Sequence, residues 1–151
     1  MKSLLAAIAM IAVAAPSAAA GGDDWVIVTS ATDGDGSVGA FVVDKGSIKD
    51  GSDGKHVDVM LIAQIQYADY LMVLDCPGKR WSFTAAKLVT GSNKPEFQNG
   101  DGWSDAPGTP MGSVLDYACS NGTKAAPVGR DLGAGDPVAA TRAWIASGAK
   151  L

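Results

Sequence analysis

The sequence predicts an α+β fold: a single antiparallel β-sheet built as a meander, a short helix tied to it by a disulfide, and a C-terminal helix. Three observations support this prediction. Short runs of β-branched and aromatic residues follow one another between residues 25 and 86. Fifteen of the sixteen acidic residues are Asp, which favours turns and caps, and Glu96 is the one Glu. The chain contains two cysteines, Cys76 and Cys119.

The first two strands are predicted to form a hairpin. Residues 25–30 are β-branched and aromatic, and an Asp-Gly turn at residues 33–36 leads to a second strand over residues 37–43. Residues 45–55 are polar and contain two further Asp-Gly-type turns, so we expect a connection without a strand there.

Three more strands complete the predicted meander. The longest covers residues 56–66, where apolar and polar residues alternate and place one face in the core. A turn at Ala68-Asp69 separates it from a strand over residues 70–76. Strands this close in sequence are expected to pair antiparallel. The last strand covers residues 80–86, with one face formed by Trp81, Phe83 and Ala85.

A helix is predicted after a long loop over residues 90–108. Thr109 is placed as its cap, Pro110 at its first position and Gly122 beyond its end. Cys119 lies at the edge of its apolar face, and Asp116 lies opposite that face, which is formed by Met111, Val114, Leu115 and Ala118. A disulfide to Cys76 would therefore bury this face against the sheet.

A second helix is predicted to start at Asp136-Pro137, after a flexible linker over residues 120–135, with Gly148 past its end. One side of this helix is formed by Val138, Thr141, Trp144 and Ile145. The sequence leaves open whether the helix docks on the core.

Residues 1–20 predict a cleavable secretory signal, because Lys2 precedes an apolar core over residues 4–15 and a small-x-small site. The core is shorter than the roughly 20 apolar residues of a membrane span, which favours cleavage between Ala20 and Gly21 over a retained anchor. No cysteine occupies the position of a lipidated terminus. We expect the chain in the Gram-negative periplasm, or secreted to the cell surface, with no stable membrane insertion.

Cleavage leaves 131 residues (151 minus 20), enough for one domain. We expect a β-rich domain at residues 21–122, a linker at 123–135 and the C-terminal helix within 136–151. The net charge of −4 gives no electrostatic basis for binding nucleic acid.

An even pair of cysteines in an oxidising compartment predicts the disulfide Cys76–Cys119. In the chain-entropy model, closing a loop of about 44 residues stabilises the fold by roughly 4 kcal/mol. The alternative is a pair of free or redox-active thiols, and it lacks the C-x-x-C spacing.

Three motifs match known kinds of functional site, but each lacks the neighbouring residues or elements that such a site requires. Residues 34–39 match G-x-G-x-x-G, but a β-branched strand follows in place of the helix that a phosphate loop requires. The clusters around Asp33 and Asp101 lack EF-hand spacing. His56 is the one histidine, too few for a typical zinc site and outside any nucleophile elbow. We expect no catalytic residue, metal or cofactor.

A candidate binding patch comprises Lys79, Arg80 and Trp81. Two cations beside an aromatic ring can meet an acidic partner through charge-assisted bonds and stacking. The alternative is a solvated turn followed by a core Trp81.

Several residues between positions 25 and 119 have the identity and spacing of residues in one protein family. They are Trp25, the run from Phe41 to Asp44 with Ser47-Ile48, Asp75-Cys76, Arg80, Trp103, Pro107-Gly108 and Cys119. Together they resemble the surface-adhesin protein E-like family of exported bacterial domains. The resemblance implies a sheet with a helix held by the Cys76–Cys119 bridge, an adhesin-type role on the cell envelope, and a homodimer formed through the sheet.

The leading hypothesis is an exported, non-enzymatic binding domain that recognises a host-matrix or envelope protein. One alternative is a periplasmic Asp-dependent hydrolase, and another is a structural envelope factor. A pocket with several inward Asp would favour the enzyme, whereas an aromatic surface without such a cluster would favour binding.

Overall fold

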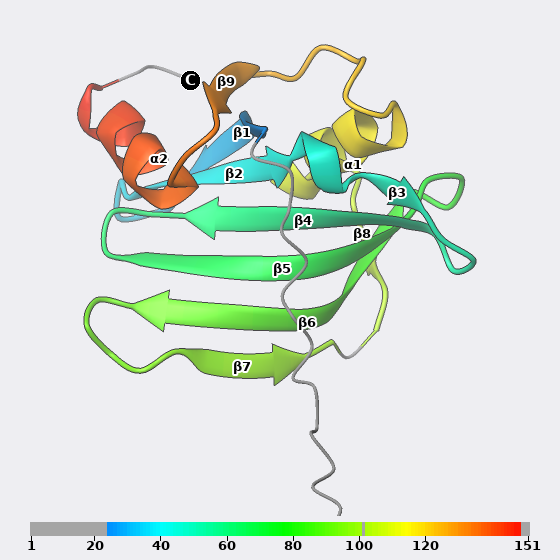
Figure 1. Cartoon of the computed structure of the whole chain (residues 1–151), viewed down its shortest axis with the longest axis horizontal. Coiled ribbons are helices and arrows are strands. Elements are labelled where there is room, and N and C mark those ends of the chain that lie inside the picture. The colour runs from blue at the N-terminus through cyan, green and yellow to red at the C-terminus, as the bar shows by residue number, and fades with distance from the viewer. Residues whose placement is uncertain (1–23, 101, 149–151) are drawn as a thin grey trace, which may run out of the picture.

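The computed structural model describes residues 24–100 and 102–148, and within them it shows one antiparallel sheet with a helix on each face (Figure 1). The predicted fold class is therefore confirmed. The helices are α1 (Pro110–Cys119) and α2 (Pro137–Ala146), and η1 (Lys45–Ser47) is a short 3-10 turn. The strands are β1 (Trp25–Thr32), β2 (Val38–Asp44), β3 (Lys49–Asp50), β4 (Lys55–Ile62), β5 (Gln66–Asp75), β6 (Arg80–Thr90), β7 (Glu96–Asn99), β8 (Ser104–Asp105) and β9 (Arg130–Gly133).

The sheet is a meander with one late addition. Its order is β7-β6-β5-β4-β2-β1-β9, with β3 paired to β4 and β8 paired to β6. The chain joins β9 to the free side of β1 after it has formed α1, and α2 follows on the opposite face. The predicted signal and its Ala20/Gly21 cleavage site lie outside the described residues.

Each face of the sheet has its own core, because successive residues of a strand point to opposite sides. Val43 belongs to the core beneath α1, whereas its neighbour Val42 belongs to the core beneath α2. The α1 core also holds Val28, Val57, Val59, Met72, Leu74, Met111, Val114, Leu115, Tyr117 and Ala118. The α2 core also holds Ile27, Ala40, Met60, Ile62 and Trp144.

The two helices are attached to the sheet in different ways. The disulfide Cys76–Cys119 is confirmed, with Cα atoms 5.8 Å apart, and it joins the last residue of α1 to the residue after β5. The second helix does dock: Trp144 and Thr141 are buried, and Arg142 Nε donates to Ala63 O at 3.1 Å. None of the helices in the described residues is long and apolar enough to cross a membrane.

The boundary predicted between the third and fourth strands is wrong. β4 ends at Ile62, and Ala63 N donates to Gln66 O across the turn. In the sequence, the alternation of apolar and polar residues continues to Ile65. In the structure, the Ile65 side chain is 71% exposed. Ala68 and Asp69, predicted as a turn, lie inside β5, because the ladder to β4 holds them extended.

The buried face predicted for the strand over residues 80–86, which is part of β6, is also partly wrong. Phe83 lies opposite Met72 and Ala85 lies opposite Leu71, so β6 has one extra residue at a β-bulge. The buried face of Trp81 and Phe83 therefore continues at Ala86, not at Ala85.

Three segments predicted without strands contain short ones. Residues 45–55 include η1 and β3, residues 90–108 include β7 and β8, and residues 120–135 include β9. None of these short strands has a strong sequence pattern, and each is defined by pairing with a longer neighbour.

Candidate functional site

The structure separates the three residues of the predicted binding patch. Trp81 packs against the α1 core, which matches the alternative reading of a core Trp. Arg80 Nη2 donates to Asp75 Oδ2 at 2.6 Å, and its guanidinium lies 5.4 Å from the ring centre of Trp103. Lys79 has a φ of 52° and lines a pocket of about 310 Å³ beside the start of α1. No common surface therefore joins the three side chains.

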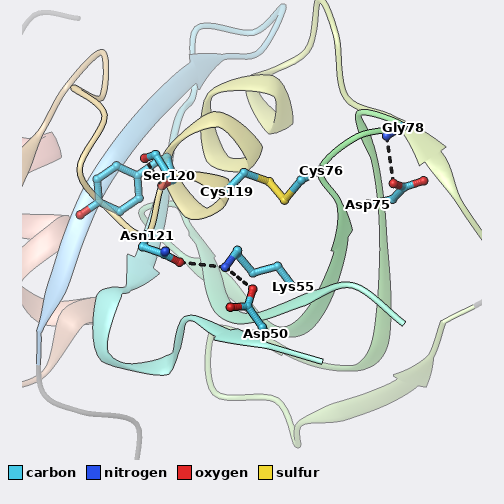
Figure 2. Close-up of a disulfide and its surroundings, with 9 residues drawn as sticks. Asp50, Lys55, Asp75, Cys76, Gly78, Cys119, Ser120 and Asn121 are labelled. Carbon is cyan, nitrogen blue, oxygen red and sulfur yellow. Dashed lines mark hydrogen bonds and ion pairs between the residues drawn. A yellow bond between two sulfur atoms is a disulfide. The ribbon is translucent and has the colours of Figure 1, made fainter. Parts of the chain in front are cut away.

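The surroundings of the disulfide form a structural network, shown in Figure 2. Lys55 is buried, and its Nζ donates to Asp50 Oδ1 at 2.6 Å and to Asn121 Oδ1 at 2.8 Å. Asn121 has a φ of 55° just beyond α1, a conformation that Asn tolerates better than most residues. The network holds the end of α1 against the β3–β4 hairpin and satisfies the buried cation.

The residues considered for metal or acid–base chemistry do not converge. His56 lies at the start of β4, and its Nε2 is 2.6 Å from Oδ1 of Asp53 in the preceding turn. Hydrogen bonds from His56 and from the backbone lower the pKa of Asp53. Within residues 24–100 and 102–148, no three His, Cys, Asp or Glu side chains lie close enough to hold a metal ion.

The largest uncovered apolar side chains on the sheet lie beyond α2. That helix contacts β2, β4 and β9, and Figure 1 shows β5, β6 and β7 beyond β4, on the side away from α2. Tyr67 of β5 packs at the margin of the α2 core, so the side chains of Asp69 and Leu71, two and four residues later, share this side. We define the open face as Asp58, Asp69, Leu71, Lys87 and Phe97.

Apolar and charged side chains alternate across the open face. Leu71 is 51% exposed and lies directly opposite Asp58 on the neighbouring strand. Phe97, on the edge strand β7, is 76% exposed and lies opposite Lys87, which in turn lies opposite Asp69. Leu71 and Phe97 are therefore two separate exposed apolar side chains, with charged groups between them, on a regular sheet.

The two carboxylates of the open face are half-buried, and a lysine partly offsets the effect of burial on each of them. Burial raises the pKa of Asp69, and Lys87 lowers it by a smaller amount. Burial also raises the pKa of Asp58, the charges of Asp69 and Asp44 add to that rise, and the charge of Lys49 opposes it. No hydrogen bond or ion pair within 4.0 Å joins either carboxylate to another residue of the described chain.

Most of the open face lies in segments for which the sequence predicts no strand. Phe97 falls in a segment predicted as a loop, and Asp69 in a predicted turn. The one available signal was residues 67–73, where Ala68, Tyr70 and Met72 alternate with a set that contains Asp69. That pattern is typical of a strand with one buried face and one mixed face.

Comparison of the chain with family models, with curated proteins and with solved structures finds no match.

Proposed function

We propose that the chain is an exported, non-enzymatic binding domain that recognises a protein or matrix surface. The observation that carries this proposal is the open face, where Leu71 and Phe97 are exposed on a rigid sheet instead of being covered by α2. The disulfide agrees with an oxidising compartment outside the cytoplasm. The resemblance of residues 25–119 to surface-adhesin protein E-like domains points the same way.

The test combines localisation with capture. Cell fractionation followed by mass spectrometry of the recovered protein is expected to find an N-terminus at Gly21 and a closed Cys76–Cys119 bond. Immobilised oxidised protein is then expected to retain a host-matrix or envelope protein. A cytoplasmic protein with an intact N-terminus and free thiols would contradict the proposal.

The rival hydrolase reading draws on one observation, the raised pKa of Asp58 and Asp69, since such shifts cluster at catalytic sites. Among the described residues, no His, Cys, Asp or Glu forms a hydrogen bond or ion pair with either carboxylate, which disfavours acid–base catalysis there. Hydrolytic activity lost in an Asp58→Asn or Asp69→Asn variant would favour the enzyme.

A further inference from the structure

The turn that follows α1 contains an Asn-Gly pair, Asn121-Gly122. In such a pair the backbone nitrogen of Gly can attack the side-chain amide of Asn, because Gly has no Cβ to hinder the approach. The five-membered ring that forms loses the amide nitrogen as ammonia, and water then opens the ring to Asp or isoaspartate. Asn99 is the other Asn that is followed by Gly.

The fold engages both groups that would react at Asn121-Gly122. The nucleophile, Gly122 N, donates to Tyr117 O at 2.9 Å instead of facing the amide carbon of Asn121. The amide is held through its oxygen, because Nζ of the buried Lys55 donates to Asn121 Oδ1 at 2.8 Å (Figure 2). Asn121 is therefore exposed to water, but its reactive groups are fixed by hydrogen bonds to other partners.

The last turn of α1 has to open before Gly122 N can move. A Cβ on Gly122 would lie 3.2 Å from Tyr117 Oη and 3.3 Å from the Lys45 side chain, so the space around this residue is narrow. Tyr117 itself is buried in the α1 core. Cys119, two residues before Asn121, is bonded to Cys76. Helix ends open more easily than helix interiors, and a covalent bond at the end suppresses that opening.

The disulfide can be reached from solvent. Cys76 and Cys119 are half-buried, and they line a pocket of about 480 Å³ together with Lys55 and Asn121. A small dithiol that enters this pocket can reduce the bond by thiol–disulfide exchange. Two electrons and two protons pass to the sulfurs, which become two thiols, and the dithiol becomes a disulfide.

We propose that Asn121-Gly122 is a latent self-modification site that the Cys76–Cys119 bond keeps closed. Once a dithiol has reduced the bond and the last turn of α1 opens, Gly122 N bonds to Asn121 Cγ and the Cγ–Nδ2 bond breaks. The proton of Gly122 N leaves with Nδ2 as ammonia, and water adds to either carbonyl of the ring. The proposal concerns the chain itself and does not depend on its binding partner.

The two products would affect the buried Lys55 differently. Asp at position 121 would place a second carboxylate beside Lys55 Nζ, which already donates to Asp50 Oδ1 at 2.6 Å. Isoaspartate adds one carbon to the main chain, so the turn that joins Gly122 N to Tyr117 O could not re-form. Reoxidation of the cysteines would then not restore the original turn.

Peptide mapping by mass spectrometry tests the proposal on the whole protein, by measuring how fast Asp and isoaspartate accumulate at position 121. The oxidised folded protein, the protein reduced by a dithiol and the protein unfolded in urea are compared at one mildly alkaline pH. Asn121 is expected to react at least about tenfold more slowly in the oxidised folded protein than in urea, because only the open state reacts. Reduction is expected to raise this rate towards the value in urea.

Two glycine substitutions separate opening of α1 from loss of the disulfide. Ala118→Gly loosens the last turn of α1 while the bond stays closed, and it is expected to speed the reaction of Asn121 about fivefold. Ala143→Gly is the matched control, because it makes the same change at an exposed position of α2. It is expected to leave the rate at Asn121 unchanged. Circular dichroism confirms that both variants are folded.

Three results would overturn the proposal. They are a rate at Asn121 in the oxidised folded protein equal to that in urea, a rate that reduction leaves unchanged, and equal effects of Ala118→Gly and Ala143→Gly. Asn99, an exposed residue of β7, shows in the same samples whether reduction unfolds the whole chain. If Asn99 in the reduced protein also reacts as in urea, the two glycine variants decide the question, because both keep the disulfide.

Discussion

The two helices are equally long, and they form for different reasons. α1 has a weak start: Thr109 occupies the cap position, but its hydroxyl donates to Ala106 O and caps no helical N–H. It buries five side chains and carries the disulfide. α2 has a strong start, since Asp136 Oδ1 accepts from Val138 N and Ala139 N, but it buries only Thr141 and Trp144. Packing and a covalent bond define one helix, whereas local capping and one aromatic anchor define the other.

Removing the disulfide should give the largest effect. Cys76→Ser with Cys119→Ser is expected to lower the free energy of unfolding by roughly 4 kcal/mol, because the bond closes a loop across a separation of 43 residues. Urea denaturation of the oxidised wild type and of the variant would measure it. A variant with unchanged stability would show that packing alone holds α1.

Trp144→Ala should release α2 with less damage to the rest of the molecule. Large-to-small changes of a buried Trp cost about 3–5 kcal/mol, and the lower end is expected because the helix can detach instead of enclosing a cavity. Hydrogen exchange is expected to lose protection in Pro137–Ala146 and to keep it in Pro110–Cys119. Loss of protection in both helices would contradict independent docking.

Substituting the N-cap residues of α1 and α2 tests whether local capping matters more for α2 than for α1. Asp136→Ala is expected to destabilise by about 1 kcal/mol, since it removes the acceptor for two helical N–H groups. Thr109→Ala should cost less, because its hydroxyl does not cap α1. Thermal unfolding of both variants would show the order, and a larger loss at Thr109 would reverse this reading of the two helix starts.

Thr141→Val is expected to stabilise α2. The Thr141 side chain is fully buried, and its Oγ1 has no hydrogen-bond partner among the described residues. The near-isosteric Val removes that buried hydroxyl, for a gain of about 1 kcal/mol. A loss of stability would indicate that the hydroxyl has a partner in solution. Ser30→Ala is the corresponding substitution on the sheet, because Ser30 Oγ also has no hydrogen-bond partner among the described residues.

The sheet region that α2 leaves open should respond to pH. The pKa values of Asp58 and Asp69 are raised in the folded state, with Asp44, Lys49 and Lys87 as the charges acting on them. Their contribution to stability is therefore fully present below the unfolded pKa of about 3.9 and is lost as the pH rises through the raised values.

The Asp58→Asn, Asp69→Asn variant lacks this titration. Its stability relative to the wild type is expected to increase from acid to neutral pH, as measured by urea denaturation at several pH values. A constant difference across that range would mean that neither pKa is raised.

The sequence was sufficient where a local signal and the tertiary structure agree. Pro110 and the apolar spacing from Met111 to Ala118 predicted α1, and Asp136-Pro137 predicted α2. It was insufficient where pairing creates the element. Glu96–Asn99 has few strand-forming residues and becomes β7 because β6 lies beside it. Periodicity alone could not reveal the bulge that transfers the buried face from Ala85 to Ala86.

The open face was beyond sequence reasoning for a related reason. The exposure of Leu71 depends on how far α2 reaches across the sheet, and the docking of that helix was left open by its sequence. The pairing of Cys76 with Cys119 was predictable, because it needed only the number of cysteines and the prediction of export.

The strand β9 affects how readily the sheet can aggregate edge to edge with another molecule. By pairing with the first three residues of β1 it covers part of the backbone at one border of the sheet, and the register of this pairing is irregular between Trp25 and Val26. Within the described chain the other border is β7, only four residues long and directly preceded by Pro95. Short border strands and prolines are the means by which natural sheets resist edge-to-edge aggregation. The exposed Phe97 therefore lies on a border strand that offers little backbone for edge-to-edge pairing.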